Sequence, residues 1–112
     1  MRSGLLFLTF LVVTLPLLAS HALAAEFTCS DCSDCSGYLQ NGTLSSGDTL
    51  KLNADITNQD GSCISFSGAD NITFDCQGFT ISGDGDSSGY GIHLNDSSNN
   101  NTIHGCTNIS YF

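Results

Sequence analysis

The residues best suited to bind a metal ion lie in and after a stretch rich in Gly, Asp and Ser, residues 83–91. Asp84 and Asp86 are two positions apart, and Asp96 follows in the next loop. Calcium prefers carboxylate oxygens, so these three side chains form a candidate calcium site. They lack the bidentate Glu that completes a calcium-binding loop. The sequence therefore favours a solvated acidic loop, and it predicts no required cofactor.

Two histidines, His93 and His104, have the side chain that copper and zinc sites use most often. Each alternates with apolar neighbours, so both are expected to point outward, from different strands. A transition-metal site needs ligands that converge on one point. We therefore interpret both residues as surface histidines.

No set of residues typical of catalysis stands out. Lys51 is the only Lys or Arg after residue 2, and it lies in an expected strand. Asp75 has no second carboxylate placed beside it, whereas glycoside hydrolysis generally uses a pair. Most other Asp residues fall in turns, where the side chain bonds to the backbone. The sequence leaves enzymatic activity undecided and leans toward a non-catalytic protein.

The charge balance is strongly acidic. The chain has 11 Asp and Glu residues against 2 Lys and Arg, for a formal charge of −9. Nucleic acids and anionic lipids are bound through basic side chains. Neither class of partner is expected, whereas solubility outside the cell fits this composition.

Residues 1–24 have the parts of a secretory signal peptide. Arg2 supplies the positive charge, residues 5–19 are apolar, and Ala22-Leu23-Ala24 matches the small-residue cleavage signal. The apolar run is shorter than the ~20 residues that span a bilayer. We expect cleavage before Ala25 and a secreted or cell-surface protein (periplasmic in a Gram-negative cell) with no membrane span.

All six cysteines are candidates for disulfide bonds, because disulfides are the favoured state after export. Three of them are spaced three residues apart, and we expect at least one of these to join Cys63 or another cysteine in the early part of the repeats. Such a bond would fasten the N-terminal segment over the open end of the fold. For Cys76 and Cys106, burial as free core residues is an equally good interpretation. The six candidates are Cys29, Cys32, Cys35, Cys63, Cys76 and Cys106.

Five Asn-x-Ser/Thr motifs match the acceptor pattern for N-glycosylation. Asn41 and Asn95 are the candidates expected to be accessible. Asn71, by contrast, falls at a turn that is equivalent to the turn at Asn100 and Asn101. Amide side chains there can bond to backbone groups of the neighbouring repeat, so these three residues are expected to form a ladder of turn asparagines.

The elements that position these residues repeat along the chain. Short runs alternate apolar and polar residues, as in strands with one buried face, and turn-forming residues separate the runs. A repeat of 28 or 29 residues built from short strands and turns is typical of a solenoid. The equivalent positions are Ile64 and Ile92, Phe74 and Ile103, and Ile81 and Ile109.

The phrase Ala-Asp-Asn-Ile-Thr-Phe-Asp-Cys-Gln-Gly at residues 69–78, followed by Thr-Ile-Ser-Gly at 80–83, resembles the right-handed parallel β-helix repeat. Exported repeat proteins of this class include NosD-like periplasmic proteins and surface proteins of archaea and bacteria, and pectin lyases share the architecture. The resemblance covers residues 49–112. It implies an all-β solenoid of about three coils, and it says little about function, because this scaffold carries unrelated activities.

We therefore divide the chain into a signal peptide (1–24), a Cys-rich cap (25–48) and parallel β-helix coils (49–112). No cap follows the last expected strand, although solenoids need capped ends. We expect the chain to be the N-terminal part of a longer protein. The open end coil is expected to associate with another chain through its strand edges.

The leading expectation for function is an exported, non-catalytic repeat module that binds a polysaccharide or cell-surface glycan, or serves in adhesion. One alternative is the N-terminal part of a polysaccharide lyase or glycoside hydrolase whose active site lies beyond residue 112. Another is a NosD-like copper accessory protein, which requires a cluster of His, Met or Cys further along the chain.

Overall fold

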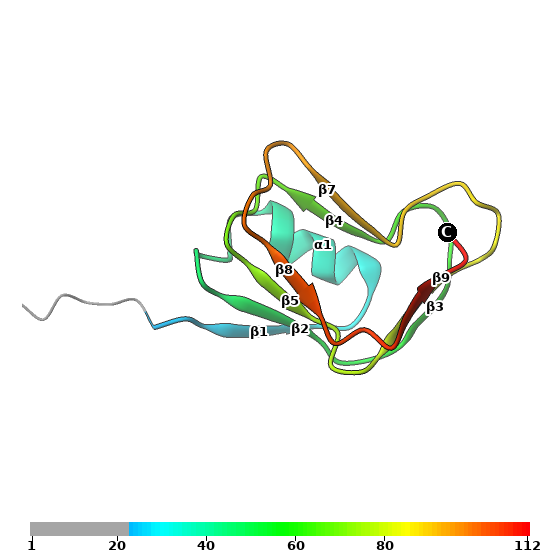
Figure 1. Ribbon diagram of the computed structural model, residues 1–112, viewed down its shortest axis with the longest axis horizontal. Coiled ribbons are helices and arrows are strands. Elements are labelled where there is room, and N and C mark those ends of the chain that lie inside the picture. Colours follow the sequence, from blue (N-terminus) through cyan, green and yellow to red (C-terminus); the bar gives the residue numbers. More distant parts are fainter. Residues whose placement is uncertain (1–22) are drawn as a thin grey trace, which may run out of the picture.

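The computed structural model describes residues 23–112 and is dominated by short strands (Figure 1). The predicted signal peptide, except for its last two residues, lies outside the described part. The elements in chain order are β1 (Glu26–Cys29), α1 (Cys32–Gln40), β2 (Thr49–Leu52), β3 (Ile56–Gln59), β4 (Ile64–Ser67), β5 (Thr73–Asp75), β6 (Thr80–Gly83), β7 (Ile92–Asn95), β8 (Thr102–His104) and β9 (Asn108–Ser110).

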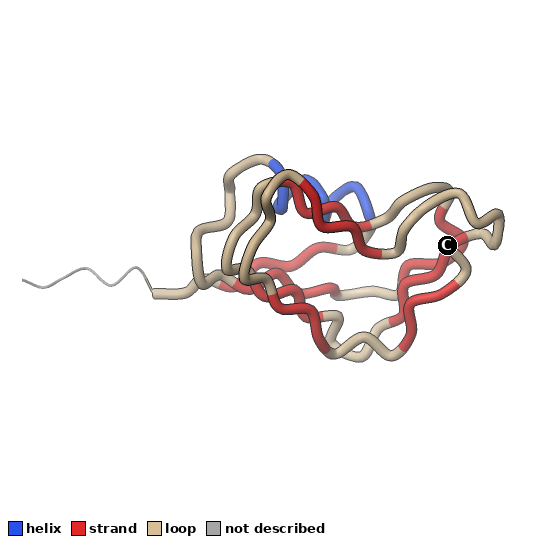
Figure 2. Tube along the Cα trace, turned by 45° about the horizontal axis from the view of Figure 1, so that its top comes forward, coloured by secondary structure: helices blue, strands red, loops and turns tan. Residues whose placement is uncertain are grey.

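The strands form three parallel sheets that the chain visits in rotation. Their orders are β1-β2-β5-β8, β3-β6-β9 and β4-β7, and every pairing is parallel. The chain makes three passes, which we call layer 1 (α1-β2-β3), layer 2 (β4-β5-β6) and layer 3 (β7-β8-β9). Figure 2 shows the passes lying along one another. Strands this short bury little surface alone, so each layer depends on the next for its stability.

The register confirms the equivalences that the repeat predicts. Ile64 pairs with Ile92, Phe74 with Ile103, and Ile81 with Ile109. Like residues therefore stack on like residues, and the alternation within each strand sends one side chain in two toward the core.

The core lies inside the three sheets. Leu50 and Leu52 are fully buried while Lys51 between them points outward, as the alternation predicts. The rings of Phe66 and Phe74 meet edge to face, with centroids 6.5 Å apart. These buried side chains belong to layers 1 and 2, whereas Leu94, Ile103 and Ile109 of layer 3 are more exposed.

The predicted N-terminal cap contains a helix that the sequence analysis did not foresee. Asp31 accepts a hydrogen bond from the backbone N–H of Asp34 (2.8 Å), and the Asp34 carboxylate accepts one from the N–H of Ser30 (3.1 Å). Asp31 is thus the N-cap residue of α1, and the bond from Ser30 to Asp34 holds the preceding residue against the first turn. The helix packs against β4 and also contacts β1 and β2, so it covers the N-terminal end of the core (Figure 1).

All six cysteines are paired, in three disulfides that fasten successive parts of the stack. The pair Cys32–Cys63 joins α1 to the start of β4, which confirms the expected link between the N-terminal segment and Cys63. The bond between Cys76 and Cys106 joins layer 2 to layer 3, so burial as free residues is the wrong interpretation for this pair. The third bond is Cys29–Cys35.

Candidate functional site

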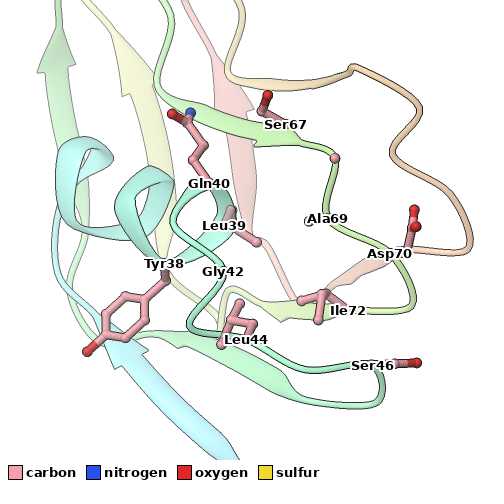
Figure 3. Close-up of a pocket in the computed structure, with 11 residues that line it drawn as sticks. Tyr38, Leu39, Gln40, Gly42, Leu44, Ser46, Ser67, Ala69, Asp70 and Ile72 are labelled. Carbon is pink, nitrogen blue, oxygen red and sulfur yellow. The ribbon is translucent and has the colours of Figure 1, made fainter.

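A cavity of about 330 Å³ opens between the end of α1, the loop that follows it and the turn from β4 to β5 (Figure 3). We call it the turn cavity. It lies where the helix stands beside stacked turns rather than beside another strand. Its lining residues are Tyr38, Leu39, Gln40, Gly42, Leu44, Ser46, Ser67, Gly68, Ala69, Asp70 and Ile72.

The floor of the turn cavity is apolar. Leu39 comes from the last turn of α1, Leu44 from the loop after it, and Ala69 and Ile72 from the turn between β4 and β5 (Figure 3). Leu39 and Ile72 are buried in the core. Tyr38 stands at one edge, where its ring packs against Phe27 with centroids 5.6 Å apart. The floor is therefore an edge of the hydrophobic core, where Leu44 and Ala69 are only partly buried.

The rim of the turn cavity is polar, and its groups are anchored by the protein itself. Gln40 donates its Nε2–H to the carbonyl of Ser65 (3.3 Å), which leaves its Oε1 available as an acceptor. Asp70 accepts the backbone N–H of Asn99 through Oδ1 (2.8 Å), which leaves Oδ2 available. Both side chains are thus held in place with one acceptor oxygen unused within the described structure.

Two serines complete the rim. Ser46 accepts a hydrogen bond from Nδ2 of Asn71 (2.8 Å), so its own hydroxyl proton remains available for donation. Ser67 donates its hydroxyl to Oδ2 of Asp96 (2.7 Å), so its oxygen remains available as an acceptor. The rim therefore carries both a donor and acceptors beside the turn cavity.

The wall of the cavity is stiffened by the turn asparagines. The side chain of Asn101 accepts the N–H of Ile72 (3.0 Å) and donates to the carbonyl of Ala69 (2.7 Å), which joins layer 3 to layer 2. Asn71 and Asn100 hold equivalent left-handed positions, with φ of 55° and 56°. Asn tolerates this conformation better than most residues. Asn101 therefore bonds to the neighbouring backbone, while the other two shape the turns.

The loop between α1 and β2 is tied down by Asp48, the only buried charged side chain in residues 23–112. Its carboxylate accepts the backbone N–H of Ser45 (2.7 Å) and of Ala25 (2.8 Å). The hydrogen bond from Ser45, followed by that from Ala25, lowers the pKa of Asp48 below its ordinary value. Asp48 therefore positions one side of the turn cavity.

The structure corrects the membership of the predicted calcium site. Asp84 and Asp86 are joined by Asp60, with carboxylate oxygens within 4.8 Å of one another, and all three are exposed. Asp96 lies beyond the far end of β7, where it binds Ser67. Hydrogen bonds from Ser88 lower the pKa of Asp86. Three carboxylates could hold a hard cation such as calcium.

Asp60 joins this cluster because two loops approach closely. Gly89 faces Gly61, and a side chain at position 89 would overlap the backbone of Gly61. The sequence analysis did not include Asp60, although the offset that relates Ile64 to Ile92 also relates Gly61 to Gly89 and could have indicated this contact. Among residues 23–112, the trio of Asp60, Asp84 and Asp86 is the one group of three possible metal ligands that the structure brings together.

The histidines do not converge. His93 on β7 stacks on the ring of Tyr90, with centroids 4.8 Å apart, and His104 on β8 lies 3.9 Å from the Asp75 carboxylate. Their strands belong to different sheets. The positions argue against a shared copper or zinc site formed by this pair.

The two glycosylation candidates differ in their surroundings. Asn41, at the end of α1, is exposed, and its Oδ1 accepts the N–H of Thr43 (3.0 Å). The Oδ1 atom of Asn95 is buried, without a hydrogen-bond partner in the described structure. Asn41 is therefore the better presented of the two acceptors.

Comparison with protein-family models, with curated proteins and with solved structures finds no match to this chain. Within residues 23–112, no helix has the length and apolar character needed to cross a membrane. The case for a function therefore rests on the turn cavity and on the stacked layers.

Proposed function

We propose that this chain is an exported, non-catalytic module of the right-handed parallel β-helix type, and that it binds a cell-surface or polysaccharide glycan in the turn cavity. The observation that carries the proposal is the combination of an apolar floor with a polar rim held by the protein's own hydrogen bonds. Rotation of the chain through three parallel sheets supports the fold, and parallel crossovers are right-handed in nearly all proteins.

A sugar ring matches the chemistry of the turn cavity. It has faces of C–H groups, which suit the floor of Leu39, Leu44 and Ile72, and hydroxyl groups at its edges, which suit the rim. The volume of about 330 Å³ lies at the lower end of ligand pockets, which span roughly 300–1,000 Å³. Anchored rim groups lose little conformational entropy on binding.

The lining argues for binding rather than hydrolysis. Asp70 is the only acidic side chain that lines the turn cavity, whereas glycoside hydrolases generally use two carboxylates that flank the scissile bond. The cavity also lacks a Lys or Arg that could take up a proton or hold an anionic sugar. Neutral sugars and amino sugars are therefore the expected ligand class.

Three disulfides support export, because such bonds persist in oxidising compartments and are rare in the cytosol. Together with the predicted signal peptide, they favour a location outside the cytoplasm. A protein in that location meets the glycans of a cell surface or matrix directly.

The binding test is calorimetry of the exported chain with neutral, amino and uronic oligosaccharides. Asp70→Asn keeps the acceptor for Asn99 but removes the charge at Oδ2, so it should weaken binding about tenfold. Ala69→Phe should block the floor and abolish binding. Ser82→Ala, on β6 of another sheet, is the control and should bind as the wild type does. Absence of binding to any sugar, or equal binding by all variants, would overturn the proposal.

We also propose that the chain ending at Phe112, in which layer 3 has no further layer stacked on it, pairs with a second copy through layer 3. Leu94, Ile103 and Ile109 are 42%, 36% and 42% exposed, whereas the layer 2 residues that pair with them are fully buried. The strands β7, β8 and β9 are the last of their sheets, and they contain no Lys, Arg, Asp, Glu or Pro. Protected strand edges normally carry such residues.

The opposite end of the stack differs from the open end, because α1 covers β4 there and the Cys32–Cys63 bond holds α1 in place. Head-to-tail stacking is therefore disfavoured at the sheet of β4 and β7. Two open ends related by a two-fold axis match strand for strand, with antiparallel contacts, and this arrangement closes the assembly as a dimer.

Light scattering after gel filtration tests the pairing. The exported wild-type chain and the control Ser82→Lys should have the mass of a dimer, while Ile103→Lys and Leu94→Lys should be folded monomers. A monomeric wild type at every concentration would refute the pairing. A mass that keeps rising above that of a dimer as the protein concentration rises would indicate open-ended stacking, and it would also refute the proposed dimer.

A further inference from the structure

The buried carboxylate of Asp48 has no cationic side chain beside it. Asp48 is 5% exposed, and the groups that bind it are two backbone N–H groups, those of Ser45 and Ala25. Lys51 is the only Lys or Arg in residues 23–112, and its Nζ binds Glu26 at 2.8 Å. Burial of a charge is costly unless a charged partner or several hydrogen bonds compensate it. Asp48 is therefore placed to accept a positive charge.

The atom that approaches Asp48 Oδ1 is the backbone nitrogen of Ala25, at 2.8 Å. Ala25 is also the residue that follows the predicted cleavage signal Ala22-Leu23-Ala24. Its carbonyl accepts the N–H of Thr49 (2.9 Å), so Ala25 is held on both sides beside the start of β2. The residue that the cleavage signal predicts as the new N-terminus is therefore the residue whose nitrogen binds Asp48.

We propose that removal of the signal peptide creates an ion pair between the new α-ammonium group of Ala25 and the buried carboxylate of Asp48. A signal peptidase would hydrolyse the Ala24–Ala25 amide with one water molecule, leaving a carboxylate on Ala24 and an ammonium group on Ala25. The inference rests on the export included in the proposed function, and it is independent of the glycan.

The pair has a structural consequence for the turn cavity. Asp48 joins the start of β1 to the loop that carries Leu44 and Ser46, because its second oxygen accepts the N–H of Ser45. The bond from the Ala25 N–H to the Asp48 carboxylate already has an ionised acceptor, and after cleavage its donor is charged as well, which adds the attraction of two opposite charges. Processing therefore fastens the N-terminus and the cavity loop together in the exported protein but leaves them more loosely joined in the precursor.

The test compares two starting residues in two backgrounds by denaturant unfolding. One chain begins at Ala25, and the other retains Ala24, which moves the ammonium group one residue away. In the wild-type background, the chain that begins at Ala25 should have a folding equilibrium constant about tenfold higher, because only this chain adds a close ion pair to the hydrogen bond. In the Asp48→Asn background, the two starting residues should give the same constant.

Two further measurements separate the ways in which the proposal can fail. The intact mass of the exported chain should correspond to a start at Ala25, and any other start would refute the cleavage position whatever the glycan binding. The α-amine should react more slowly with an acylating reagent in the wild type than in Asp48→Asn. Equal stability of the two wild-type chains, or equal amine reactivity, would refute the ion pair even if cleavage occurs before Ala25.

Discussion

The side-chain amide of Asn101 spans the boundary between layers 3 and 2 and accepts the backbone N–H of Ile72 at 3.0 Å. The same amide donates to the carbonyl of Ala69. It therefore satisfies two backbone groups of the turn that forms the wall and floor of the turn cavity. Asn101 therefore contributes both to the stacking of layer 3 on layer 2 and to the shape of the turn cavity.

Asn101→Ala should lower the free energy of unfolding by about 2 kcal/mol, because it leaves two partly buried backbone groups without their partners. Asn108→Ala is the matched control. Its amide binds only the exposed hydroxyl of Ser110, so its loss should cost less than about 0.5 kcal/mol. Urea denaturation measures both values. Equal losses for the two variants would show that the Asn101 bridge contributes nothing of its own.

Ile72→Asp should abolish folding. The Ile72 side chain is 2% exposed, and an unpaired buried carboxylate costs more than about 4 kcal/mol, a large part of the stability of a small domain. Thr73→Asp, which changes the outward-facing neighbour on β5, should remain folded. Far-ultraviolet circular dichroism and amide NMR dispersion distinguish the two. A folded Ile72→Asp protein would contradict the assignment of inward and outward faces.

The double replacement Cys32→Ser with Cys63→Ser should destabilise the protein by about 3–4 kcal/mol, the chain-entropy value for a loop of 31 residues. Thermal unfolding under oxidising conditions measures the loss. Peptide mapping without reduction should recover the Cys32–Cys63 and Cys76–Cys106 links, and alkylation should label no cysteine. Free thiols in the exported protein would contradict the fastening of α1 to β4.

Acid should destabilise the protein partly through Asp48. Its pKa in the folded state is lowered below the ordinary 3.8 by the N–H groups of Ser45 and Ala25, so the unfolded chain binds the proton more readily. The stabilisation is fully present above the ordinary pKa and is lost as the pH falls through the lowered one. Urea midpoints measured from neutral to acidic pH should fall less steeply for Asp48→Asn. Identical profiles would contradict this role.

Much of the strand pattern could be predicted from the sequence because its cause is local. The alternation around Phe74 and Ile81 sets which side chains are buried, and the repeat sets which residues pair. The helix could not be predicted in the same way. Residues 32–40 include Ser, Asp and Gly, which favour helices weakly, so α1 depends on its capping by Asp31 and on two disulfides.

The candidate site was less accessible to sequence reasoning than the fold. The turn cavity exists because α1 lies beside the turn that follows β4. The repeat in the sequence does not include α1, so it does not predict that contact. Asp60 is a different case, because Gly61 and Gly89 are separated by the same offset as Ile64 and Ile92. The repeat therefore indicates that these two loops meet, but it does not indicate that Asp84 and Asp86 turn toward Asp60. Asp96 follows the far end of β7 and lies with Ser67 instead.

The most direct test of the account is amide NMR of the exported, disulfide-bonded chain titrated with neutral and amino oligosaccharides. Binding in the turn cavity predicts shifts confined to residues 38–46 and 67–72, saturating with sugar concentration and absent in Ala69→Phe. Shifts that cluster elsewhere, or a spectrum unchanged by every sugar tested, would contradict the proposed glycan site.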